Sequence, residues 1–264
     1  GDMFQLSVEL YDTKDKKVVW SDRWQEKWDN LPTIKGSLSD GILKALDTTS
    51  KVEKKVETTN TESYEFYLKG KHIHEKRKNA DESKIAEEFL KKSIELDNNL
   101  IASKYMLSKI YRETADYDKA MFFSILILEQ AEELDDKYYI SLSLNSIGLI
   151  NSDKGEYKKG LDYYNRSLLI SEEFDYKNVT GHTLNNIGII YAIKGDYDKA
   201  AKHFKKSLAI RKDLDDKHGM VDNLANIGHL YQKKGHYKKA LDYYNHSLLI
   251  IKDIDSVFLM ARIL

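Results

Sequence analysis

The chain has 264 residues, of which 41% are hydrophobic and 32% charged, a composition that excludes a wholly disordered protein. The 42 basic side chains nearly balance 43 acidic ones, which argues against nucleic-acid binding, because neutralising phosphates requires a basic excess. Cysteine is absent, which excludes disulfides and thiolate metal sites and fits a cytoplasmic protein. No apolar run reaches the roughly eighteen residues of a membrane-spanning helix, so no membrane role is expected.

The first fifty residues carry a strand pattern followed by a helix pattern. Apolar and polar residues alternate over the first ten positions, as in a half-buried strand, and a polar turn over residues 13–16 leads into a second strand over 17–24. Apolar residues then recur at every fourth position, which predicts one face of a helix. These residues are Ile34, Leu38, Ile42 and Leu46. Residues 51–60 lack a core pattern and are expected to be a linker or the tail of that helix.

The rest of the chain repeats itself with a period of 40 residues. Each copy has a glycine within a predicted helix, and a second glycine follows it seven residues later. A tyrosine, a small residue and a Ser-Leu pair then follow at fixed offsets. The two sets of glycines are Gly148, Gly188, Gly228 and Gly155, Gly195, Gly235. Two weaker copies precede these, one with Ala115 at the turn and one around Gly70 with about four extra residues in its turn.

A glycine inside a helix costs roughly 1 kcal/mol relative to alanine, so its repetition requires a packing reason. Close approach of two antiparallel helices supplies that reason, with a small residue such as Gly160 facing Gly148 from the second helix. The second glycine of each unit is expected to end the first helix in a left-handed cap, and Asp196 to cap the helix that follows it. Each unit is then a helical hairpin that must stack on its neighbours.

This pattern resembles the tetratricopeptide repeat over residues 61–256, in the longer-period variant of kinesin light chains and of scaffolds that grip extended peptides. The resemblance implies a mainly α fold, a right-handed α-α superhelix, preceded by a small β-hairpin and a helix. The six extra residues of the long period are expected in the second helix or in the loop between units, for example over residues 172–178. The predicted domains are a partial amino-terminal domain and a solenoid of five repeats with the start of a sixth hairpin. Their bounds are 1–50, the linker 51–60 and 61–264, with repeats at about 61–98, 99–136, 137–176, 177–216 and 217–256.

The candidate binding residues lie on the first helices of the units, around the repeated asparagines. Asparagine is a poor helix former, and its amide can both donate to and accept from a peptide backbone. By the resemblance, the positions just before each helical glycine line the concave groove of peptide-binding relatives. The predicted groove residues are Asn145, Asn185, Asn186, Asn226, Leu149, Ile189, His182, Asp222, His229 and Gln232. The alternative is that the asparagines bond to the neighbouring helix and tie units together.

No sequence motif for catalysis, a cofactor or a metal is present. His72 and His74 are two residues apart on a helix and point to nearly opposite sides, so they cannot share a metal ion. We therefore expect no enzyme activity, no cofactor and a protein or extended peptide as the partner. A homodimer through the amino-terminal hairpin or the uncapped carboxyl end is a further expectation.

Two stretches of the amino-terminal segment, Leu10-Tyr11-Asp12-Thr13 and Val19-Trp20-Ser21-Asp22-Arg23-Trp24, resemble the end of a TolB-like domain. The resemblance implies a scaffold or regulatory module of a bacterial signalling protein. Alternatives are the regulatory part of a class III adenylate cyclase, the sensor part of a transcription regulator, and RNA binding as in pentatricopeptide proteins. The even charge balance disfavours the last of these.

Overall fold

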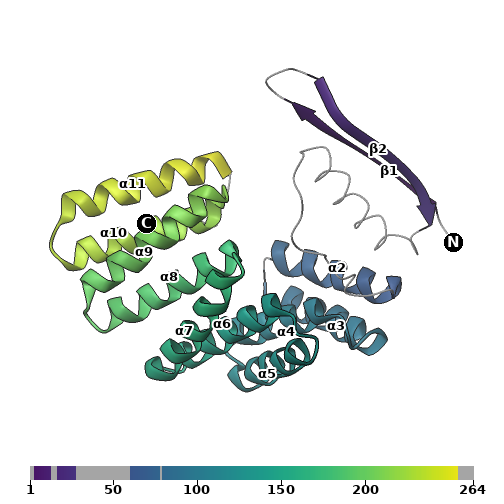
Figure 1. Cartoon of the computed structure of the whole chain (residues 1–264), viewed down its shortest axis with the longest axis horizontal. Helices are drawn as coiled ribbons and strands as arrows, with labels where there is room; N and C mark the ends of the chain where they lie inside the picture. Colours follow the sequence, from purple (N-terminus) through teal and green to yellow (C-terminus); the bar gives the residue numbers. More distant parts are fainter. Residues whose placement is uncertain (1–2, 13–16, 28–59, 78, 255–264) are drawn as a thin grey trace. The chain divides into compact units, whose positions relative to one another are not determined.

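The computed structural model describes residues 3–12, 17–27, 60–77 and 79–254 (Figure 1). The predicted helix over residues 34–46, most of the predicted linker and the start of a sixth hairpin lie outside the described residues. The chain divides into two compact units, Gly1–Asp116 and Tyr117–Leu264. The boundary between the units falls inside the second predicted repeat.

In the first unit, two antiparallel strands form a hairpin, β1 (Met3–Asp12) and β2 (Lys17–Lys27). The register pairs Leu6 with Trp24 and Leu10 with Trp20, with an irregularity between Leu10 and Tyr11. This antiparallel pairing matches the two strands that the alternation in the sequence predicts.

The same unit contains α2 (Thr61–Lys76), α3 (Ala80–Leu96) and α4 (Ile101–Glu113). Helices α2 and α3 pack as a pair, and α4 contacts both. Gly70 makes the pairing close, because a Cβ there would lie 2.8 Å from Leu90 Cγ. Helix α3 already begins at Ala80, so most of the extra residues expected in the first turn are helical instead.

The second unit is a run of helices of nearly equal length, most of them 17 residues long. They are α5 (Tyr117–Glu133), α6 (Lys137–Asp153), α7 (Tyr157–Glu173), α8 (Lys177–Ile193), α9 (Tyr197–Asp213), α10 (Lys217–Lys233) and α11 (Tyr237–Ile254). Connections inside a hairpin and between hairpins are equally short. The extra length of the repeat therefore lies in its helices, and the longer loop considered over residues 172–178 does not form.

Every connection in this unit uses one residue in the left-handed conformation, which ends the preceding helix. Within hairpins this residue is glycine, with φ of 79° at Gly155 and 78° at Gly195, as the sequence predicted. Between hairpins it is aspartate, with φ of 53° at Asp135. Asp196 then caps α9 by accepting a hydrogen bond from the Lys199 N–H at 3.4 Å, which confirms the predicted cap.

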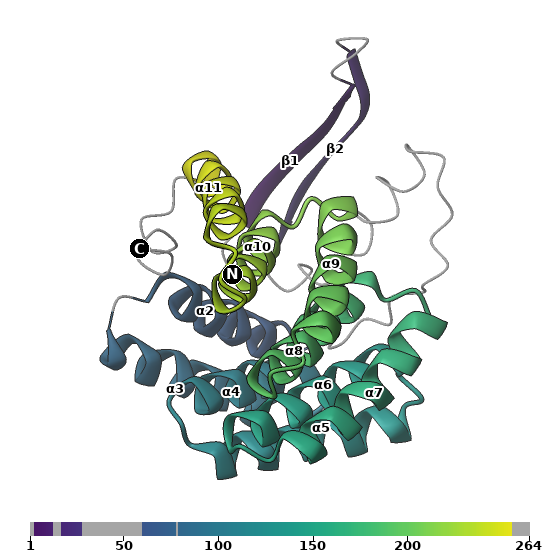
Figure 2. The same ribbon diagram turned by 90° about the vertical axis from the view of Figure 1, so that its left-hand side faces the viewer.

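Helices α6, α8 and α10 are the first helices of their hairpins, and α7, α9 and α11 are the second helices (Figures 1 and 2). Neighbouring first helices contact each other more extensively than neighbouring second helices do. The first helices therefore form the inner side of this unit. The predicted solenoid of stacked helical hairpins is confirmed here.

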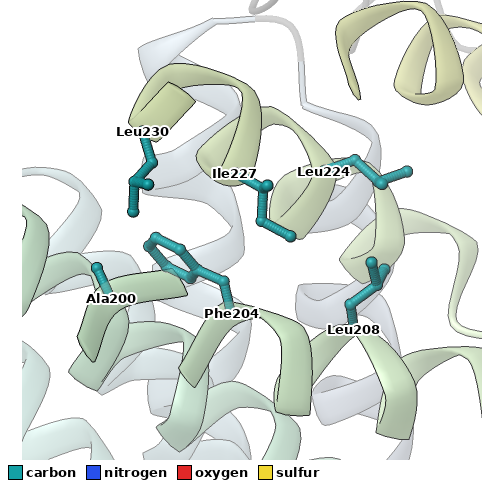
Figure 3. Packing of buried hydrophobic residues seen from close by; sticks show 6 residues of the cluster. All are labelled: Ala200, Phe204, Leu208, Leu224, Ile227 and Leu230. Carbon is teal, nitrogen blue, oxygen red and sulfur yellow. The ribbon is translucent and has the colours of Figure 1, made fainter. Parts of the chain in front are cut away.

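The core between successive hairpins is apolar and well buried. Figure 3 shows the cluster in which side chains of α9 meet side chains of α10. Its members are Ala200, Phe204, Leu208, Leu224, Ile227 and Leu230. Burying these side chains stabilises the stack, because each hairpin covers the apolar face that its neighbour leaves open.

Candidate functional site

The first helices of the second unit present a continuous strip of side chains that are not buried, which we call the inner strip. Its members recur every three or four residues along each helix, so they share one face. They are Leu142, Ser146 and Leu149 on α6, His182, Asn186, Ile189 and Ile193 on α8, and Asp222, Asn226 and His229 on α10. Most of the predicted groove residues belong to it.

Three predicted residues lie elsewhere. Asn145 and Asn185 are buried, with exposed fractions of 7% and 9%, beneath the inner strip. Gln232 is exposed, but its Oε1 accepts a hydrogen bond from the Tyr244 hydroxyl of α11 at 3.3 Å. The predicted set therefore mixes residues of two layers of these helices, because adjacent residues on a helix point in different directions.

The two buried asparagines tie neighbouring hairpins together. Asn185 Oδ1 accepts hydrogen bonds from Asn223 Nδ2 and from Asn226 Nδ2, both at 3.0 Å. One repeat earlier, Asn145 Oδ1 accepts from Asn186 Nδ2 at 3.2 Å and from the Thr183 hydroxyl at 3.1 Å. These bonds are the inter-unit ties that the sequence left open as an alternative.

The half-buried asparagines of the inner strip, Asn186 and Asn226, each donate one side-chain N–H to the buried asparagine beneath them. Their Oδ1 atoms make no hydrogen bond to any described residue of the chain. An asparagine amide has two donors and one acceptor oxygen, so each side chain keeps an acceptor and a donor for the solvent side. The tie fixes the orientation of the amide and leaves its outer half available.

A serine that closes each repeat was not recognised as a structural residue from the sequence. Ser207 Oγ donates to the Gly181 carbonyl at 2.6 Å, and it also lies 3.0 Å from Asn223 Oδ1. Ser167 makes the equivalent bond to the Ser141 carbonyl at 2.7 Å. In the sequence, the recurring Ser-Leu pair was the signal for this role. The serine recurs because its buried hydroxyl group forms a hydrogen bond to the first helix of the hairpin.

A buried arginine holds one residue of the inner strip in place. The guanidinium of Arg211 bonds to Asp216 Oδ2 at 2.6 Å and to His182 Nδ1 at 3.1 Å. Because a guanidinium only donates, His182 Nδ1 is the acceptor, which fixes the tautomer of the ring. Gly219 makes room for this group, since a Cβ there would overlap the guanidinium. Arginine occurs at this repeat position only on α9, so periodicity could not predict it.

Within the described part of the chain, no group of three or more potential ligand side chains is placed to hold a metal ion. His72 is exposed and His74 is buried, on different sides of α2. Among the same residues, no helix combines the length and the apolar character needed to cross a membrane.

Comparison with known proteins agrees with this geometry. The tetratricopeptide repeat family matches residues 138–213 and, overlapping, residues 179–253. No curated protein sequence matches the chain.

Several solved structures share the fold at low sequence identity. A Rap protein complexed with competence and sporulation factor is 16% identical with a TM-score of 0.69, over 85% of this chain and 61% of that one. Aspartyl phosphate phosphatase F from Bacillus subtilis is 18% identical with a TM-score of 0.64, over 86% and 58%. BtubC from P. vanneervenii is 16% identical with a TM-score of 0.59, over 88% and 94%. The chain thus spans about three-fifths of the length of the first two proteins.

Proposed function

We propose that the chain is an interaction module that binds an extended peptide segment of a partner protein along the inner strip of its stacked hairpins, which match the tetratricopeptide repeat family over residues 138–253. The observation that carries the proposal is the pair of outward amides at Asn186 and Asn226. They occupy the same position in adjacent repeats. The hydrogen bond to Asn145 fixes the orientation of Asn186, and the hydrogen bond to Asn185 fixes that of Asn226. A peptide backbone offers alternating donors and acceptors, which such amides can pair.

Apolar side chains beside the amides supply a second kind of contact. Ile193 is 56% exposed, and Ile189 and Leu149 are half-buried on the same face. Exposed aliphatic side chains that adjoin polar groups suit the side chains of a bound peptide. The fold that the chain shares with the Rap protein structure, whose complex contains competence and sporulation factor, is consistent with binding of a partner by such repeats.

A phage-displayed library of random peptides tests this proposal. Peptides enriched on the wild-type protein are synthesised, and their affinity is measured by calorimetry for the wild type and for Asn186→Ala/Asn226→Ala. We expect the double variant to bind about tenfold more weakly or worse, because two charge-neutral hydrogen-bond pairs are lost. Circular dichroism and thermal unfolding establish that the variant is folded.

The matched control is Asn165→Ala/Asn245→Ala, which removes two exposed asparagines from the outer faces of α7 and α11. We expect this variant to bind the enriched peptides like the wild type. The proposal fails if no peptide is enriched, or if a folded inner-strip variant binds as tightly as the control.

The resemblance of the amino-terminal segment to a TolB-like domain supports a narrower proposal, a scaffold or regulatory module in a cytoplasmic bacterial signalling protein. The alternatives are the regulatory part of a class III adenylate cyclase and the sensor part of a transcription regulator. Sequencing the complete reading frame distinguishes them, because a cyclase domain in it would favour the first alternative and a winged-helix domain the second.

A further inference from the structure

The outer faces of the second helices can be compared with one another, because equivalent positions in α7, α9 and α11 are all exposed. At three such positions α9 carries only lysines, whereas α7 and α11 carry an acidic, an amide and a basic side chain. The residues are Lys202, Lys205 and Lys206 on α9, Asp162, Asn165 and Arg166 on α7, and Asp242, Asn245 and His246 on α11. These exposed positions do not pack against the chain itself, so the lysines of α9 are available for contacts with other molecules.

A depression of about 420 Å³ lies beside these lysines, between α9 and the carboxyl-terminal part of α10. Its apolar lining comes from Ala201, Leu230 and Tyr231, and its charged rim comes from both helices. The rim residues are Asp198, Lys202, Lys205 and Lys234. Leu230 also belongs to the buried cluster between the two helices, so the floor of the depression rests on the core (Figure 3).

The charges at the rim do not cancel. Lys234 Nζ lies 2.6 Å from Asp198 Oδ1, and this pair accounts for the one carboxylate in the lining. Lys202 and Lys205 form no ion pair with any residue in the described ranges. The depression therefore carries an excess of two positive charges, although the whole chain has a net charge of −1.

From this combination we infer that the depression binds an acidic segment of a partner protein. Carboxylates of the segment pair with Lys202 and Lys205, and an apolar side chain lies over Ala201 and Tyr231. Complementary charge attracts such a segment over a distance of about 10 Å at moderate salt, and the apolar floor adds contact area. Nucleic acid fits less well, because a phosphate backbone requires a longer basic track and would meet Asp198.

Fluorescence anisotropy of labelled peptides tests the inference. The acidic probe is a peptide of about ten glutamate and serine residues with one central leucine, and the neutral probe has glutamine in place of glutamate. At an ionic strength near 50 mM, where screening is weak, we expect the acidic probe to bind and the neutral probe to bind at least about tenfold more weakly. A single-stranded oligonucleotide with a similar number of charges is measured in parallel.

The variant Lys202→Glu/Lys205→Glu is compared with Lys158→Glu/Lys238→Glu, which makes the same charge change at exposed lysines of α7 and α11. We expect the first variant to lose binding of the acidic probe by about tenfold or more, and the second to lose at most about twofold. Equal losses in both variants, no binding by the wild type, or tighter binding of the oligonucleotide would each overturn the inference.

A further variant tests the role of the rim ion pair in the opposite direction. Asp198→Asn frees Lys234 from its carboxylate partner, so we expect it to bind the acidic probe several-fold more tightly than the wild type. Unchanged or weaker binding would contradict a site that includes Lys234. All three variants change exposed side chains, and thermal unfolding establishes that each is folded.

Discussion

A Cβ added to Gly188 of α8 would lie 2.6 Å from Cε1 of Phe204 on α9. The same relationship joins Gly148 to Tyr164 at 2.7 Å and Gly228 to Tyr244 at 2.6 Å. Each of these three glycines therefore leaves space for an aromatic ring from the second helix of its own hairpin. The ring fills the space that a side chain on the first helix would occupy, and it sets the separation of the two helices.

Gly188→Ala should destabilise the second unit by roughly 1–3 kcal/mol, because the added methyl group displaces the ring of Phe204. Adding Phe204→Leu should not restore the loss, since the leucine in the corresponding place, Leu90, would itself lie 2.8 Å from a Cβ added to Gly70. Urea unfolding followed by circular dichroism measures both effects.

Gly181→Ala in the same helix is the matched control. A Cβ there would lie 3.5 Å from Ile210 Cγ2, which is ordinary van der Waals contact, so we expect unchanged or slightly higher stability. If the two alanine substitutions lowered the unfolding midpoint equally, contact with the ring would not explain the cost.

The aromatic partner shows what one sequence can and cannot predict about this fold. Periodicity identified the glycines as points of close helix approach, and Gly160 does approach, since a Cβ on it would lie 3.0 Å from the Gly148 carbonyl oxygen. The ring that occupies the space comes from a residue one helical turn further along, whose direction depends on the crossing geometry of the helices. Repetition in the sequence indicates that a position is constrained, but only the structure shows which neighbouring side chain constrains it.

The candidate site was predictable to a similar extent. The sequence placed the repeated asparagines on the first helices, and the structure brings Asn186 and Asn226 to the inner strip. The sequence alone could not distinguish these amides from that of Asn185. Asn185 is the neighbour of Asn186 in the chain, but its side chain is buried and accepts a hydrogen bond from the next hairpin. Arg211 was not predicted, because a buried charge that occurs once in the repeats leaves no periodic signal.

Ala115→Gly should stabilise the end of α4 by about 0.5–1 kcal/mol. Ala115 has a φ of 60°, a left-handed conformation that strains any residue with a Cβ, while the equivalent turns use glycine. Gly195→Ala imposes the reverse change and should destabilise its turn by about 1 kcal/mol. Hydrogen exchange of the flanking helices measures both, and shifts of the same sign in the two variants would contradict the argument.

The stability of α2 should fall as the pH is lowered from about 7 to 4, because of His74. Burial, with smaller contributions from Arg77 and Lys109, lowers the pKa of His74 from 6.5 to about 4. The unfolded chain binds a proton at this residue below pH 6.5, whereas the folded chain stays neutral until about pH 4. The stabilisation is therefore complete above pH 6.5 and declines by at most about 1.4 kcal/mol per pH unit below it.

Hydrogen exchange of α2 in His74→Gln should show a smaller pH dependence over this range than the wild type. Other titrating groups contribute in both proteins, so the difference between them isolates the histidine. His72→Gln alters an exposed histidine on the same helix and should retain the wild-type pH dependence. A wild-type pH dependence in the His74 variant would show that carboxylates alone govern the decline.

Lys104→Met should raise the stability of α4 by about 1 kcal/mol or more. Lys104 is only 2% exposed and occupies the repeat position at which later units bury a leucine, such as Leu144. Burial lowers the pKa of its ammonium group, opposed by the nearby charge of Asp97. The free energy needed to remove a charged group from water exceeds the stabilisation from a partly exposed partner, so an apolar side chain of similar length should be favoured.

Urea unfolding and hydrogen exchange of α4 measure the change, with Lys109→Met as the control at an exposed position of the same helix. A loss of stability specific to Lys104→Met would show instead that the buried ammonium and Asp97 act as a required pair.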